Sequence, residues 1–295
     1  MNLSIAITDN GLSLDGQFIP IPFETQQRLA KDGNDPQYRR FLVNVVYLVA
    51  HKRIDFEAHA AAVKSRSAYT RSSPVYVGLL EACCGFDQWD DRGWLLAGVR
   101  GDGNVELQRR GAELRVIAPF QTLVGSPSED LVGKVVTVRS PSFRPHLSIG
   151  YHFIIGPNGG PAATDALVRI YLNCTPLGAC LILMDLARYA LETPLCFQAK
   201  FRNHPEEYGS ADSGVIYLDP ETFARHREAL IAMFARHSAE LKEATSYFTD
   251  RLMPGVSMAT EKLGPRTTVK SFGELSAAQF VDDALRRRLS ADSTD

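Results

Sequence analysis

The sequence predicts an α+β protein, and three observations lead to that class. The stretch from Leu167 to Arg251 reads as strand, helix, strand, strand, helix and a last short extended piece, SYFTDRLMPG, which is the split β-α-β-β-α-β (ferredoxin-like) pattern. Residues 95–155 hold several short alternating runs separated by turn residues, as in a β-meander. Residues 41–49 carry a broad apolar stripe at helical spacing. An N-terminal half of helices and a β-meander is therefore expected to pack with a split β-α-β-β-α-β C-terminal half.

The N-terminal half begins with a weakly alternating segment. Residues 1–22 are broken by glycine and proline, which predicts a short hairpin. Residues 23–52 read as helical with a break at 33–36, and the apolar stripe lies in their second half. The alanine-rich residues 57–65 predict another helix.

The β-meander follows. Asp102-Gly103 and Arg110-Gly111 supply turn glycines between extended runs. Short strands are expected at 95–100, 105–109, 113–118, 135–139 and 149–155.

A domain boundary is predicted just after the meander. Residues 158–163 are rich in glycine and other breakers, which is typical of a joint between domains. The predicted domains are residues 1–157, helical and β-meander, and residues 158–295, which hold most of the candidate site.

Side-chain alternation separates two faces in the strands of the C-terminal half. One face is apolar and can pack on the two helices; its members are Val168, Ile170 and Leu172 in the first strand and Leu195, Phe197, Ala199 and Phe201 in the second. The other face carries cations with a phenol and amides between them: Arg169, Tyr171, Asn173, Gln198, Lys200 and Arg202. Like charges this close are unfavourable unless they are solvated or face an anion. This face is therefore either a solvated surface, as one-sided antiparallel sheets normally show, or an anion site.

The second helix of this half has a clear start signal. Asp219 suits the N-cap, Pro220 suits the first helical position, and Glu221 lies near the positive end of the helix dipole. A last helix is expected over residues 275–289, where three arginines in the final turn favour the dipole.

Composition narrows the class of protein. The 295 residues are 45% hydrophobic, and 32 basic against 34 acidic residues give a net charge of -2. This balance argues against nucleic-acid or membrane-surface binding, which requires a net basic footprint. No apolar run approaches the roughly 20 residues that span a bilayer, and the first residues do not read as a signal peptide. A cytoplasmic protein is therefore expected.

Motif content excludes several chemistries. The five cysteines form no CxxC, which suits buried thiols in a reducing compartment, and no Cys or His pair has zinc-finger spacing, so no metal is expected. The sequence contains no GxSxG elbow and no glycine-rich nucleotide loop. No cofactor is predicted.

An ordered series of motifs resembles a known family. RIYLN, FQAKF, EEYGSADSGVIYL, SYFTDRLMPGVSMA and KSFGE, preceded by VVTVRSP and GYHFIIG, resemble the HopA type III effector family, best over residues 150–288. Two positions depart from the family's pattern. Ser210 stands where family members often carry Arg, and the FTK-like motif ends in Asp250, with the cation one place later at Arg251.

The resemblance implies a function in peptide modification. Relatives in actinobacterial gene clusters accompany a phosphotransferase-like kinase, and the pair dehydrates Ser and Thr in class V lanthipeptides and thioamitides. The resemblance implies that the kinase phosphorylates the hydroxyl and that the HopA-like partner eliminates phosphate, giving dehydroalanine or dehydrobutyrine. The expected partners are thus a phosphorylated precursor peptide and that kinase.

Phosphate β-elimination needs a base for the α-proton, cations for the phosphate and a donor for the enolate-like carbonyl. Lys200 is the candidate base, because a nearby cation such as Arg169 or Arg202 would lower its pKa. Arg169 is the preferred phosphate clamp, since a guanidinium grips phosphate in a fork, and Arg202 and Arg251 are further clamps. The alternative for each is an ordinary surface cation.

Five other residues complete the candidate site. Tyr171 and Asn173 could donate to the enolate oxygen, or they are a packing Tyr and a turn-capping Asn. Asp212 could orient a Lys or Arg, or it is an ordinary turn residue. His152 is the candidate general acid, with a structural His as the alternative, and Lys270 is a further candidate cation.

Two other functions stay open. One is a non-catalytic scaffold that binds the peptide or stabilises the kinase; it would leave the cations scattered and show an exposed apolar patch elsewhere. The other is an effector that binds a host protein, for which a secretion signal is expected. A lyase instead requires Lys200, Arg169 and a second cation around one concave site.

Overall fold

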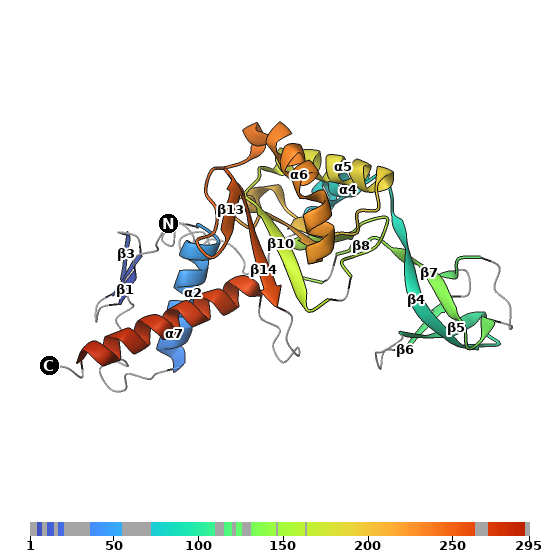
Figure 1. The fold of residues 1–295 in the computed structure, drawn as a ribbon, viewed down its shortest axis with the longest axis horizontal. Helices are drawn as coiled ribbons and strands as arrows, with labels where there is room; N and C mark the ends of the chain where they lie inside the picture. The colour runs from blue at the N-terminus through green and yellow to red at the C-terminus, as the bar shows by residue number, and fades with distance from the viewer. Residues whose placement is uncertain are drawn as a thin grey trace.

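The computed structural model of the chain describes most of its residues. They are residues 5–7, 11–14, 17–20, 36–54, 72–109, 115–119, 122–125, 131–145, 147–162, 164–262 and 271–292. The described residues form three antiparallel sheets with helices packed on the largest one, which confirms the α+β class (Figure 1).

The largest sheet has seven strands in the order β13-β14-β10-β12-β11-β9-β8. Their bounds are β8 Phe143–Arg144, β9 Tyr151–Ile155, β10 Ala166–Leu172, β11 Gln198–Arg202, β12 Gly214–Leu218, β13 Asp250–Met253 and β14 Val256–Lys262. The four middle strands, β14, β10, β12 and β11, are the split β-α-β-β-α-β unit, because an antiparallel strand lies between the two strands of each β-α-β crossover.

The last strand of this unit differs from the prediction. The extended piece expected up to Gly255 forms only the edge strand β13, and the strand that pairs with β10 is β14, one hairpin later. Gly255 makes the turn possible: its φ is +74°, and a Cβ there would collide with the backbone of Lys242.

Helices α4 (Pro74–Ala82), α5 (Pro176–Glu192) and α6 (Pro220–Arg236) lie together on one side of this sheet (Figure 1). They bury the predicted apolar strand face, in which Ile170, Phe197 and Phe201 are fully enclosed. Helix α6 begins where the sequence predicts, since Asp219 Oδ1 accepts a hydrogen bond of 2.9 Å from the N–H of Thr222. Two short 3-10 turns, η4 (Pro205–Glu207) and η5 (Ser238–Glu240), complete this half.

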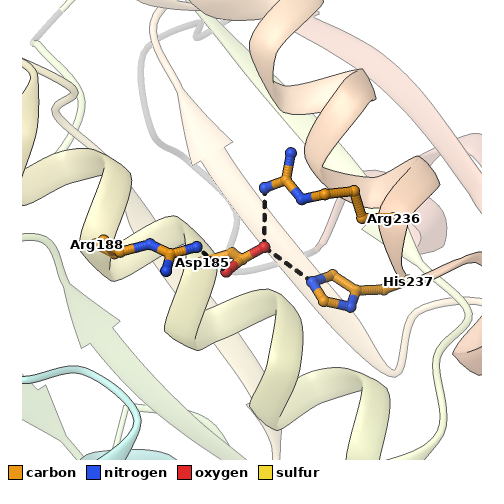
Figure 2. A network of polar contacts seen from close by, with 4 residues as sticks. All are labelled: Asp185, Arg188, Arg236 and His237. Atoms are coloured by element: carbon orange, nitrogen blue, oxygen red, sulfur yellow. Dashed lines mark hydrogen bonds and ion pairs between the residues drawn. The ribbon is translucent and has the colours of Figure 1, made fainter.

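A buried carboxylate ties α5 to α6. Asp185 on α5 accepts from Arg188 Nη2 at 2.7 Å and from Arg236 Nη2 at 2.8 Å, and it lies 3.0 Å from His237 Nε2 (Figure 2). Arg236 and His237 are at the C-terminal end of α6, where cations are favoured by the helix dipole. The network links the two helices.

The opposite side of the sheet is covered by segments from both ends of the chain. Helix α2 (Pro36–Val46) continues into the π-helical turn η1 (Tyr47–His51), and α7 (Phe272–Asp292) runs alongside them (Figure 1). They share a core that includes Leu42, Val46, Ala277 and Val281. Both predicted helices are thereby confirmed, apart from residues 23–35, which lie outside the described residues.

The meander forms a separate four-stranded sheet in the order β6-β5-β4-β7, which stands out to one side (Figure 1). Its strands are β4 Gln88–Val99, β5 Asn104–Arg109, β6 Arg115–Pro119 and β7 Val135–Pro141. The predicted N-terminal hairpin is part of a small sheet of β1 (Ile5–Ile7), β2 (Gly11–Leu14) and β3 (Gln17–Pro20). The helix predicted at 57–65 lies outside the described residues.

The boundary predicted between residues 157 and 158 stays a prediction. The strand expected at 149–155 forms as β9, but it joins the largest sheet instead of the meander. Strands on both sides of that boundary, β9 and β10, therefore belong to one sheet. None of the described helices combines the length and the apolar run that crossing a bilayer requires.

Two glycines give a matched test of how α7 is seated. A Cβ on Gly273 would clash with the ring of His51, because it would overlap the Cδ2 atom. A Cβ on Gly78 in α4 would meet no atom within 4 Å. We expect Gly273→Ala to lower the free energy of unfolding by about 1–3 kcal/mol through overpacking. Gly78→Ala should raise it by up to about 1 kcal/mol through helix propensity. Urea denaturation measures both, and equal effects of the two substitutions would contradict the close approach of α7 to η1.

Candidate functional site

The sheet face opposite α5 and α6 is largely buried. Its aromatic residues form a cluster that Phe272 of α7 closes; the buried members are Tyr151, Phe153, Tyr171, Val215, Tyr217 and Ala259. The side chain of Arg169 is only 15% exposed and that of Arg202 only 9%. The solvated-surface alternative is therefore wrong for this face, because η1 and α7 cover it. The alternation of side chains along a strand shows which residues share a face. It does not show which other segments of the chain cover that face.

Lys200 lies at the centre of this face, in β11. Its Nζ atom is 4.4 Å from the ring centre of Tyr151, 5.8 Å from that of Phe153 and 6.0 Å from that of Tyr217. No hydrogen-bond acceptor or carboxylate among the described residues contacts this ammonium group. Burial lowers the pKa of Lys200 to about 8; Asp212 opposes that shift, and Arg169 adds to it. The three N–H donors of Lys200 thus have no acceptor among the described residues.

Asp212 is the buried anion of the site. It precedes β12, accepts from the Tyr151 hydroxyl at 3.1 Å and lies 3.5 Å from Arg202 Nη2. Burial alone would raise its pKa, but Lys52 and Arg202 outweigh burial and hold the pKa well below the usual range. Asp212 therefore stays ionised and keeps two cations in place.

Ser210 lies next to this anion. Arg202 Nη2 donates to Ser210 Oγ at 3.2 Å, and the guanidinium lies 4.2 Å from the Tyr151 ring centre. Arg202 thus places a cation beside Ser210.

Lys52 and His51 are site residues that the sequence reasoning missed. Lys52 follows η1, its carbonyl accepts from the N–H of Ala211 at 2.7 Å, and its Nζ lies 5.1 Å from the Tyr47 ring centre. Burial lowers the pKa of Lys52, Asp212 raises it, and Arg202 and Lys200 lower it further. His51 contacts Tyr171 edge-on, with 5.2 Å between ring centroids. Nothing in the local sequence distinguishes Lys52 from an ordinary cation at a helix C-terminus.

Arg169, the preferred clamp, is already engaged. Its Nε donates to Glu261 Oε2 at 2.9 Å, and its Nη2 makes a second bond to the same oxygen. The guanidinium also lies 5.3 Å from the Tyr217 ring centre. Arg169 is thus paired with a carboxylate across the β10–β14 ladder, and it acts on Lys200 through its charge.

The remaining predicted residues are not on this face or do not point into the cluster. His152 shares the opposite face with Phe201, where its Nε2 lies 3.2 Å from Glu81 Oε1. Asn173 Nδ2 donates to the carbonyl of Ala244 at 2.8 Å. Arg251 is exposed on the edge strand β13 and pairs with Glu243 at 3.3 Å, and Lys270 lies outside the described residues.

The charges in the cluster favour an anionic ligand. The cations Lys52, Arg169, Lys200 and Arg202 face two carboxylates, those of Asp212 and Glu261, which leaves an excess of two positive charges. Counting Glu274 of α7, which acts on both lysines, still leaves one. This positive excess favours an anionic group such as a phosphate. The described part of the chain gathers no group of three His, Cys, Asp or Glu that could hold a metal ion.

Buried histidines on both sides of the sheet make stability depend on pH. Burial lowers the pKa of His51 and of His152 from 6.5 to about 4. Between pH 6.5 and 4 the unfolded chain binds protons that the folded chain does not, so stability falls as the pH drops through this window. We expect a loss of roughly 2 kcal/mol per histidine between pH 7 and 5.

Urea midpoints at pH 7 and 5 measure this loss. His152→Gln should reduce it, and His204→Gln, at a histidine in a partly exposed turn, is the matched control. An unchanged pH dependence in His152→Gln would contradict the burial of a neutral imidazole there.

Comparisons with known proteins give a family and two distant structural neighbours. Residues 142–294 match the model of the HopA1 effector protein family. The effector protein from Pseudomonas syringae pv. tomato strain DC3000 is 23% identical with a TM-score of 0.37; the match covers 46% of this chain and 52% of that one, about half its length. The effector protein from Pseudomonas syringae pv. syringae strain 61 is 11% identical with a TM-score of 0.45, covering 91% and 90%. No curated protein matches the chain.

Proposed function

The chain belongs to the HopA1 effector protein family, and we propose that it is a phosphoserine/phosphothreonine lyase. Its substrate would be a ribosomally made precursor peptide that a partner kinase has phosphorylated, in the cytoplasm where both are made. The observation that carries the proposal is Lys200, a partly buried lysine whose pKa is lowered to about 8 and whose ammonium has no protein acceptor among the described residues.

The reaction would use these residues in a simple order. Neutral Lys200 would take the α-proton of the phosphorylated residue, and the electron pair of that C–H bond would become the new Cα=Cβ double bond. The Cβ–O bond would break, and phosphate would leave with the bonding electrons. Lys52 and Arg202 would hold the leaving phosphate, because Asp212 keeps both close to the base. The products are a dehydroamino acid and inorganic phosphate, and the step needs no redox partner.

Mass spectrometry of a synthetic phosphoserine peptide tests the proposal. The purified protein alone should convert the peptide to a product lighter by one phosphoric acid, and inorganic phosphate should appear in equal amount. Lys134→Ala, at an exposed lysine in the meander, is the matched control and should behave as the wild type. A phosphopeptide that stays intact with the protein, alone and with the kinase, would refute the lyase.

A second candidate function, a scaffold that binds the kinase, is favoured by an apolar stripe on the far side of the molecule. Leu177, Met184 and Leu191 recur every seven residues on α5 and are 57%, 44% and 58% exposed. Val75 and Leu79 of the neighbouring α4 are 78% and 53% exposed. Such a surface suits a protein partner. Under this alternative, Leu177→Lys would weaken binding of the kinase, and the phosphopeptide would remain intact in every mixture.

A further inference from the structure

A polar cavity of about 500 Å³ borders the candidate site. Its wall includes Arg53, Tyr247, Ser246 and Arg251. Ser246 Oγ lies 2.9 Å from Nδ1 of His51, and the His51 ring in turn contacts Tyr171 of the sheet face. The imidazole ring of His51 thus contacts both the cavity wall and the sheet face that carries Lys200.

Backbone bonds hold the wall of this cavity in place. The N–H of Tyr247 donates to the carbonyl of Ala50 at 3.0 Å, and the N–H of Gly255 donates to the carbonyl of Glu243 at 3.1 Å. Asn173 Nδ2, a residue predicted for the site, anchors Ala244 in the same wall. The residues that line the cavity are therefore positioned before any ligand arrives, which lowers the entropic cost of binding.

Arg53 is the distinctive residue of the wall. Its φ of +58° makes it the only non-glycine residue of the described segments with a positive φ, a conformation that carries strain in most side chains. Its guanidinium lies 4.0 Å from the ring centre of Tyr247. A guanidinium stacked on a ring keeps its N–H edge free for a carboxylate. None of the described carboxylates pairs with Arg53, whereas Arg251 is already paired with Glu243.

We propose that this cavity is a second substrate site, in which Arg53, stacked on Tyr247, binds an acidic side chain of the peptide that is modified on the sheet face. The inference rests on the proposed function for the identity of the ligand as a peptide. Polar walls with hydroxyl groups suit a hydrated peptide segment better than an apolar ligand. The wall also holds two carboxylates, Asp250 and the Glu243 that is paired with Arg251, which leaves Arg53 as the cation that would receive an anion.

The chain order explains why one peptide would reach both places. The side chain of Lys52 interacts with the charges of Asp212 and Lys200 on the sheet face. Arg53, the next residue, lines the cavity, so two neighbouring residues of the chain serve the two places. An extended peptide advances about 3.3 Å per residue, so two residues of one peptide that lie a few positions apart would occupy the two places. The site would therefore select precursor peptides by an acidic residue at a fixed distance from the modified one.

Fluorescence anisotropy with labelled serine peptides tests this inference. The peptides carry Glu, Gln or Lys at each flanking position, and each is made with and without phosphate. The wild type should bind the peptide with Glu at one position roughly tenfold more tightly than its Gln counterpart. Arg53→Asn should abolish that difference while keeping the backbone, because Asn tolerates a positive φ. Arg53→Glu should reverse the preference to Lys, and Arg227→Ala, at an exposed arginine on α6, is the matched control.

The outcomes separate this inference from the proposed function. A preference for Glu that Arg53→Asn removes in unphosphorylated peptides would support the cavity, even if no phosphate is ever eliminated. If phosphate is eliminated but Arg53→Asn binds every peptide as Arg227→Ala does, the cavity is not a substrate site. The proposed lyase activity would be unaffected by that result. A wild type with no preference at any flanking position would likewise overturn the cavity as a substrate site.

Discussion

Lys200→Arg is expected to abolish phosphate elimination while the protein continues to bind the phosphopeptide. Arginine keeps the positive charge that faces the phosphate, but it does not lose its proton in a protein and so cannot act as the base. A general base contributes about 10²–10⁴-fold to a rate, so kcat should fall by at least two orders of magnitude. Lys200→Ala should lose both the base and part of the affinity.

The pH dependence of the wild type gives the same prediction a second readout. The base must be neutral, so kcat/KM should rise with pH and level off above about 8, the value to which burial lowers the pKa of Lys200. Product formation measured by mass spectrometry from pH 6 to 9, beside anisotropy for binding, checks both statements. If Lys200→Arg keeps wild-type turnover, Lys200 is not the base.

Asp212→Asn is expected to be the most destabilising isosteric substitution in the site. Its carboxylate is 5% exposed and is the anion that Lys52 and Arg202 share, so removing the charge leaves two largely buried cations without their counter-ion. Breaking a buried ionic group in this way costs about 3–5 kcal/mol. Because the folded pKa of Asp212 is depressed, its stabilising contribution is present above its unfolded pKa and is lost as the pH falls below that value.

Thermal unfolding measures this effect, with Asp90→Asn, at an exposed carboxylate in β4, as the control that should change Tm little. Asp212 also raises the pKa of Lys200, so any activity left in Asp212→Asn should reach its plateau at lower pH than in the wild type. An unchanged Tm in Asp212→Asn would mean that Lys52 and Arg202 do not depend on this carboxylate.

The strand faces and helix starts of the C-terminal half could be predicted because their causes are local. Alternation along β10 and β11 separates Ile170 and Phe201 from Arg169 and Lys200. The start of α6 at Asp219 and Pro220 could be predicted because the first backbone N–H groups of a helix have no partner within it. The Asp219 side chain accepts from one of them, and Pro220 has no N–H group. The β13–β14 hairpin was missed because Gly255, its turn residue, reads equally well as the end of a strand.

The site itself was only partly predictable. Lys200, Arg202 and Asp212 come from one continuous region, whereas Lys52 lies more than a hundred residues earlier and outside the segment that matches the family. Lys52 reaches Asp212 only because η1 packs on the sheet. The hydrophobic pattern of the sequence near residue 52 does not predict that contact. His152 was expected in the site but lies on the other side of the sheet. The alternation of side chains along β9 shows which side His152 faces only when the pairing of β9 with β11 is known.

The covering of the sheet face by η1 and α7 has a consequence for how the protein folds during synthesis. The face is completed only when residues near the beginning of the chain meet the last helix, a contact that closes a loop of more than two hundred residues. During synthesis on a ribosome, η1 emerges long before α7, the helix with which it covers the sheet face. The strands that carry Arg169, Lys200 and Arg202 can thus pair first on a nascent chain, and their shared face stays uncovered until α7 has emerged.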